Sequence, residues 1–106
     1  MTPEERYEDL VDEFAGVDGV TPPTGGSGFG RGALRYHRKI FAMFVRGQLV
    51  VKLPAPRVAA LVAATAGVPF DAGKGRPMRE WIVLAGNDDG QWRALIAEAF
   101  AFAVDG

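Results

Sequence analysis

Apolar residues recur at helical spacing in the first fifteen residues of the chain. The positions i, i+3, i+4 and i+7 are occupied by Tyr7, Leu10, Val11 and Phe14. This single apolar stripe predicts an amphipathic helix over residues 3–15, with acidic side chains on its other face. Thr2 and Glu5 form a capping box before it, and Gly16 follows as a stop signal.

The next part of the chain alternates apolar and polar residues, as half-buried strands do. Strands are expected at 33–36, 39–45 and 48–53, with Phe41, Met43 and Val45 on one face of the second. Because the connections between these segments are short, an antiparallel meander is favoured over a parallel sheet. Residues 78–84 form a fourth expected strand, with Trp81 and Val83 on one face.

Two further helices follow from the same reasoning. Pro54 and Pro56 end the third strand and begin a helix, for which Gly67 is the expected stop. A last helix is expected at 91–104, after a turn at 87–90 that can also cap it. The order α-β-β-β-α-β-α predicts an α+β fold, in which helices pack on a curved antiparallel sheet of about four strands.

Composition limits the chain to one domain. Its 106 residues, 48% of them hydrophobic, fit a single domain over residues 1–106 with a glycine-rich loop at 16–32. The absence of cysteine excludes disulfides, thiol nucleophiles and cysteine metal sites. No signal-peptide pattern and no apolar run of about 20 residues is present, so we expect a cytoplasmic protein that does not cross a membrane.

Charge is strongly segregated along the chain, although the net charge is only −1. Residues 1–18 hold seven acids and one base, whereas residues 19–70 hold seven bases and no acid. Such a pattern indicates either a basic face for an anionic partner or an acidic helix that folds back over the basic hairpins and neutralises them. The sequence leaves these two alternatives open.

The sequence contains little that indicates a catalytic site or a metal-binding site. His37 is the only histidine, which excludes a multi-histidine metal site, and no metal or cofactor is expected. Ser27 is the only serine and lies in the glycine run 25–32, without the strand-turn-helix context of a nucleophile. That run and the segment 73–76 combine glycine with bases and can bind an anion, but both are typical of loops. We therefore expect no catalytic residue and no enzyme activity.

The bases that could form an anion-binding face lie on or near the predicted hairpins and loops. They are Arg31, Arg35, Arg38, Lys39, Arg46, Lys74 and Arg76, with His37 beside them. Phe29 and Tyr36 lie among them, and nucleic-acid surfaces use this mixture of bases and aromatic rings.

Four short motifs in order resemble the N-terminal domain of the TfoX/Sxy family, which is similar to the YjbR-like double-wing domains. The motifs are Lys39-Ile-Phe-Ala-Met, Leu49-Val-Val-Lys-Leu-Pro followed by Arg57-Val, Pro69-Phe-Asp, and Gly75-Arg-Pro-Met-Arg-Glu-Trp-Ile-Val. The resemblance covers about residues 25–104. The chain departs from the family pattern at Gly28-Phe29-Gly30, where Met-Phe-Gly is usual, and at His37-Arg38, where a glycine is common.

This resemblance implies an α+β fold with a curved antiparallel sheet, a bacterial cytoplasmic setting and a role in transcriptional regulation or DNA binding. It supplies no catalytic residue. The leading hypothesis is a non-enzymatic module that binds DNA through basic hairpins acting as wings. The alternative is a protein-interaction or homodimerisation domain, in which the acidic helix of one chain pairs with a basic hairpin of another.

Overall fold

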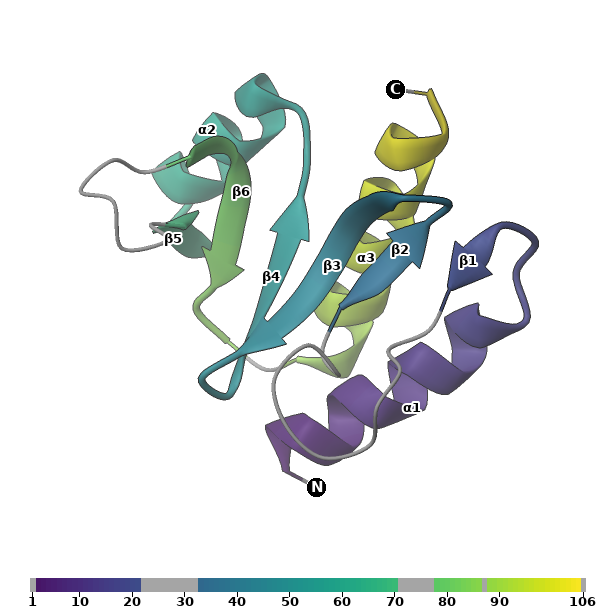
Figure 1. Cartoon of the computed structure of the whole chain (residues 1–106). Coiled ribbons are helices and arrows are strands. Elements are labelled where there is room, and N and C mark those ends of the chain that lie inside the picture. The colour runs from purple at the N-terminus through teal and green to yellow at the C-terminus, as the bar shows by residue number, and fades with distance from the viewer. Residues whose placement is uncertain (1, 22–32, 71–77, 87, 106) are drawn as a thin grey trace.

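The computed structural model describes residues 2–21, 33–70, 78–86 and 88–105. Within them the chain forms three helices and six strands (Figure 1). In chain order these are α1 (Pro3–Ala15), β1 (Val20–Thr21), β2 (Leu34–Tyr36), β3 (Lys39–Val45), β4 (Gln48–Lys52), α2 (Ala55–Ala63), β5 (Gly67–Phe70), β6 (Met78–Leu84) and α3 (Asp89–Asp105). The predicted α+β class is confirmed.

The strands form one sheet in the order β1-β2-β3-β4-β6-β5, and all neighbouring strands are antiparallel. The four predicted strands correspond to β2, β3, β4 and β6, so the expectation of about four strands was too low. The missing two lie at the edges of the sheet. β1 has only two residues, too few to show alternation, and β5 contains Pro69, which is uncommon inside strands.

Helix α1 has the predicted bounds and the predicted capping box. The backbone N–H of Glu5 donates to the Thr2 hydroxyl at 3.1 Å, and the backbone N–H of Thr2 donates to the Glu5 carboxylate at 2.9 Å. Helix α3 begins two residues earlier than expected. There the Asp88 carboxylate accepts a hydrogen bond from the backbone of Gln91 at 2.8 Å, so the predicted capping turn supplies a cap.

The end of α2 differs from the prediction, because Gly67 is not its stop. The chain leaves the helix at Thr65, whose φ of 60° lies in the left-handed region. The backbone N–H groups of Thr65 and Ala66 donate to the carbonyls of Val62 and Leu61, the pairing of a Schellman motif. Glycine is usual at this left-handed position. Because threonine is not a helix stop signal, the sequence does not indicate that the helix ends here.

Strand β3 contains a bulge that overturns its predicted alternation. Leu34 pairs with Ala42 while Arg35 pairs with Ile40, so Phe41 is an extra residue on β3. Phe41 and Ala42 are both fully buried in the core shared with the helices. The expectation that Phe41 shares a face with Met43 and Val45 was therefore wrong.

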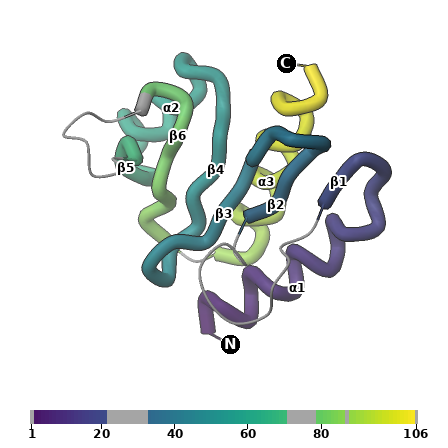
Figure 2. Tube along the Cα trace, in the orientation of Figure 1, coloured from purple at the N-terminus to yellow at the C-terminus, as the bar shows by residue number. Residues whose placement is uncertain are grey.

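All three helices cover the same face of the sheet. Helix α3 packs on β3 and β4, and α2 packs on β5 and β6 (Figure 1). Figure 2 shows α1 beside the N-terminal end of α3, where Tyr7 stacks on Phe44 of β3 with ring centroids 5.3 Å apart. Trp92 of α3 is fully buried, and its indole N–H donates to the carbonyl of Gly86 at 3.0 Å.

Candidate functional site

Five of the eight predicted site residues lie in the described part of the chain, and all five are exposed. They are Arg35 in β2, His37 and Arg38 in the turn between β2 and β3, Lys39 at the start of β3, and Arg46 in the turn between β3 and β4. The other three, Arg31, Lys74 and Arg76, lie outside the described residues, as does Phe29.

The β2–β3 turn is anchored by the segment that follows α1. His37 has a φ of 56°, and its backbone N–H donates to the carbonyl of Gly19 at 2.9 Å. The His37 ring also contacts the Tyr36 ring, with centroids 4.3 Å apart. Tyr36 in turn packs against Phe100 of α3. These contacts fix the position of the hairpin that carries four of the five described site residues.

Lys39 has a structural partner within the fold. Its ammonium group donates to the carbonyl of Ala103 in the last turn of α3, at 3.5 Å. A cation at the C-terminal end of a helix is favourable, because the last carbonyl groups lack partners and carry partial negative charge. Lys39 therefore stabilises the end of α3, which makes it the least available of the predicted bases for an external anion.

Arg46 lies at the opposite end of β3 from Arg38. Figure 1 shows the two turns at opposite ends of the strand. The eight residue-to-residue steps from Arg38 to Arg46 correspond to about 26 Å at the usual rise of a strand. Arg46 and Gly47 have φ values of 52° and 78°, as a type I′ turn requires. The predicted basic surface is thus divided into two separate ends.

The ion pairs between described residues all join helical residues. They are Arg6–Asp89 at 3.8 Å, Arg57–Glu98 at 2.9 Å, Arg93–Glu13 at 2.9 Å and Arg93–Asp89 at 2.8 Å. Helix α1 therefore pairs with α3. The hydrogen bond to Glu98 raises the pKa of Arg57, and those to Glu13 and Asp89 raise the pKa of Arg93. Of the alternatives that the sequence left open, neutralisation of the hairpins by α1 is not seen among the residues described.

Charge is also segregated in space. The described strands and the two turns at 37–38 and 46–47 carry six bases and one acid, whereas α1 carries six acids and one base. The six bases are Arg35, Arg38, Lys39, Arg46, Lys52 and Arg79, and the acid is Glu80. None of these six bases forms an ion pair with a carboxylate of the described residues. The molecule thus has a basic sheet and an acidic first helix.

Sequence inspection did not single out Lys52, Arg79 or Trp81 as site residues. In β6, Ile82 and Leu84 are fully buried in the core, so Trp81 and Val83 point to the sheet face opposite the helices. We call this side the open face because the helices pack on the other one, although Val50 of β4, which also lies on this side, is fully buried. Lys52 pairs with Trp81 across β4 and β6, and its ammonium lies 5.9 Å from the centroid of the indole ring.

The open face carries an apolar row across four strands. Successive cross-strand partners are Met43 of β3, Val50 of β4, Val83 of β6 and Val68 of β5. Arg35 faces the same side, because its neighbours Leu34 and Tyr36 both contact the core. The alternation in 78–84 predicted that Trp81 and Val83 share a face, but it contained no signal for which face the helices cover.

The described part of the chain contains neither a metal-binding cluster nor a membrane-spanning helix. Within 2–21, 33–70, 78–86 and 88–105, no three histidine, aspartate or glutamate side chains gather where they could hold a metal ion. None of the described helices is both long and apolar enough to cross a bilayer.

Tyr7 is buried in the core, and this burial raises the pKa of its hydroxyl group. The hydroxyl therefore stays protonated.

Comparisons with protein-family models, with curated proteins and with solved structures find no match for this chain. The resemblance to the TfoX/Sxy N-terminal domain therefore stays a prediction. Within the described residues, its motifs fall on β3, β4, α2, β5 and β6. These elements are neighbours in the fold.

Proposed function

We propose that this chain is a non-enzymatic binding module for an anionic partner, with DNA as the first candidate. One observation carries the proposal: the strands and their two described turns hold six bases and one acid, and no described carboxylate pairs with those bases. An anion that approaches the sheet meets a positive potential, whereas α1 repels it. The resemblance to the double-wing domains implies the same partner, and by that resemblance the hairpins of this chain correspond to the wings.

The distance between the two basic turns suits an extended polyanion. Arg38 and Arg46 are about 26 Å apart along β3, which corresponds to roughly eight base pairs at 3.4 Å per step. A duplex that lies along β3 would reach both turns, with Arg35 of the open face near one of them. Contacts of this kind neutralise phosphates and position a protein without reading base sequence.

Fluorescence anisotropy over a salt series that starts near 50 mM tests this proposal. The probe is a labelled duplex of about 16 base pairs, twice the length that separates the two turns. Each neutralised phosphate contributes about 0.9 to the slope of log K against log salt. We expect Arg38→Gln and Arg46→Gln each to reduce that slope by about this amount. Absence of binding by the unmodified chain near 50 mM salt would overturn the proposal.

Arg57→Gln is the matched control, because it removes the same charge from a helix. Its guanidinium is engaged by Glu98, with hydrogen bonds of 2.9 and 3.1 Å. The slope should remain that of the unmodified chain. If Arg57→Gln reduces the slope as much as the turn variants do, the attraction comes from overall charge and the hairpins are not the contact surface.

A second candidate function is self-association or binding to another protein through the acidic helix. Exposed acids of α1, among them Glu4, Glu8, Asp9 and Asp12, form no ion pair with the described residues. Among the described residues, one molecule therefore presents two surfaces of opposite charge that do not pair with each other, and α1 of one copy can pair with a hairpin of the next. Light scattering at about 100 μM in low and high salt tests this, because screening weakens such contacts. A monomer mass that is independent of salt would contradict it.

A further inference from the structure

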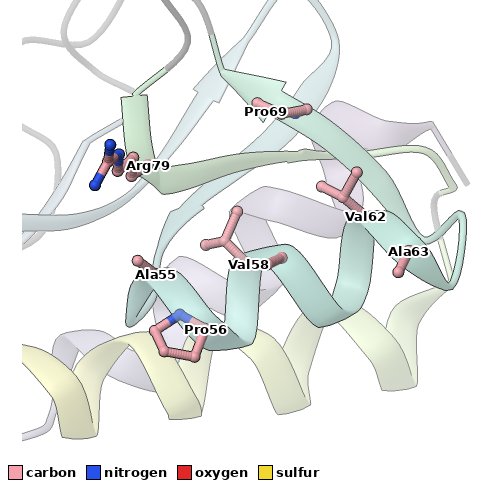
Figure 3. A pocket seen from close by; sticks show the side chains of 8 residues that line it. Ala55, Pro56, Val58, Val62, Ala63, Pro69 and Arg79 are labelled. Atoms are coloured by element: carbon pink, nitrogen blue, oxygen red, sulfur yellow. The ribbon is translucent and has the colours of Figure 1, made fainter.

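An apolar hollow of about 640 Å³ lies beside α2 (Figure 3). Its wall on the helix includes Ala55, Val58, Ala59 and Val62, and Pro69 of β5 faces them. Of the described residues that line it, only Arg79 of β6 is polar. We call this hollow the α2 groove. Its volume is in the range of small-molecule sites, which are mostly apolar with a few placed polar groups.

The α2 groove is elongated and charged at one end. Its helical wall runs from Ala55 to Ala63, a length of about 12 Å at the rise of an α-helix. Figure 3 shows Arg79 near the Ala55 end and Ala63 at the other end. Helix α2 contains no acidic residue, and Arg79 is exposed and forms no ion pair among the described residues. At the end of this apolar trough stands a guanidinium that no described carboxylate pairs with.

A second hollow of about 530 Å³ adjoins the first at this charged end. It shares Ala55 and Arg79 with the α2 groove and adds Lys52, Glu80 and Trp81. Two bases and one acid thus surround the junction, so the local charge favours an anion. Trp81 is half-buried beside this junction and can report binding through its fluorescence, whereas Trp92 is fully buried in the core.

We propose that the α2 groove binds an aliphatic carboxylate, with its hydrocarbon chain along α2 and its carboxylate on Arg79. The apolar wall favours a hydrocarbon chain because contact removes apolar surface from water. The planar guanidinium can hold both oxygens of a carboxylate through charge-assisted hydrogen bonds. A nucleic-acid backbone would leave the apolar wall uncovered, so the ligand proposed here differs from DNA although Arg79 is one of the six bases of the sheet.

Titration with decanoate below its micelle concentration tests the proposal, with decanol as the neutral ligand of equal chain length. Binding is followed by Trp81 fluorescence and by NMR shifts of the α2 amides. We expect decanoate to bind about five- to tenfold more tightly than decanol, since only the acid pairs with Arg79. Arg79→Gln should bring this ratio to about one. Arg46→Gln, which removes the same charge far from the groove, should leave it unchanged.

Two neighbouring alanines provide a test of location. Ala59 and Ala60 are both exposed on α2, but only Ala59 lines the groove. Ala59→Glu places a carboxylate in the groove and should weaken decanoate binding at least tenfold, whereas Ala60→Glu should change it less than twofold. Circular dichroism confirms that both variants are folded. Equal effects of the two substitutions, equal affinities for decanoate and decanol, or no decanoate binding would each overturn the proposal.

Discussion

Gly67 in β5 lies so close to the carbonyl oxygen of Val83 in the neighbouring strand β6 that no side chain fits between them. A Cβ atom at position 67 would overlap that oxygen and would lie 3.0 Å from the side chain of Ile82. Because a backbone oxygen cannot move aside as a flexible side chain can, this position accepts only glycine. The residue that resembled a helix stop is therefore required for the pairing of an edge strand.

Gly67→Ala should lower the free energy of unfolding by about 3 kcal/mol, since β5 must shift away from β6 to admit the methyl group. Urea denaturation followed by tryptophan fluorescence measures the change. Gly16→Ala is the control, because nothing lies within 4 Å of a Cβ atom there. It should change stability by less than about 0.5 kcal/mol. Similar values for both substitutions would show that β5 is not packed as described.

Thr65→Gly should stabilise the fold by about 1 kcal/mol. The threonine occupies a φ of 60°, where a β-branched side chain is strained and glycine is not. Thermal or urea unfolding measures the gain. Ala64→Gly, at a neighbouring position with a φ of −84°, should give no gain, because the alanine is unstrained there. A stability loss in Thr65→Gly would contradict the left-handed end of α2.

Arg46→Asn should also stabilise the fold, by about 0.5–1 kcal/mol. The turn Arg46-Gly47 has positive φ at both residues, and Asn-Gly is the preferred sequence for such a turn. Arg46→Gln is the matched control, because it removes the same charge but has no preference for the left-handed region. If both variants gain equally, the gain comes from charge removal and not from the turn.

Glu5 should make the start of α1 sensitive to acid. The hydrogen bond from the Thr2 backbone, followed by that from the Thr2 side chain, lowers the pKa of Glu5 below 4.5. A lowered folded-state pKa means that the stabilisation is present above the unfolded-state value and is lost as pH falls through the folded-state value. Unfolding midpoints between pH 6 and pH 3 should therefore fall less steeply in Glu5→Gln than in the unmodified chain.

Glu4→Gln provides the comparison for that experiment. It removes an acid from the same helical turn but leaves the capping box of Thr2 and Glu5 intact. Its pH dependence should remain close to that of the unmodified chain. If the two variants behave alike, the acid sensitivity comes from the general charge of the first turn.

The elements with long periodic patterns were predictable from the sequence, and the local irregularities were not. Helix α1 and the strands β2, β3, β4 and β6 follow their expected spans, because each has clear periodicity or turn signals. The bulge at Phe41 was hidden, since an extra residue reverses the alternation without changing composition. Thr65 concealed the end of α2 in a similar way, because its left-handed conformation depends on the Schellman hydrogen bonds and not on residue type.

The candidate site was predictable in composition but not in arrangement. The sequence indicated the excess of bases in its middle segment, and the structure places the described ones in or beside the sheet. The separation of Arg38 from Arg46 follows from the length of β3, which was predicted, but the sequence interpretation treated the hairpins as one surface. Arg79 acquires interest through the packing of α2 beside β6, and Trp81 through the pairing of β4 with β6, contacts between distant segments that a periodic pattern cannot reveal.

The two edges of the sheet determine how this molecule meets its own copies. β1 ends the sheet with two residues, and β5 ends it with Pro69, which has no backbone N–H to donate. Fibril growth by strand addition needs a long uninterrupted edge, and neither of the described edge strands provides one even though Val68 is 59% exposed. The two described edge strands therefore offer the backbone of a second copy few hydrogen-bonding groups with which to pair.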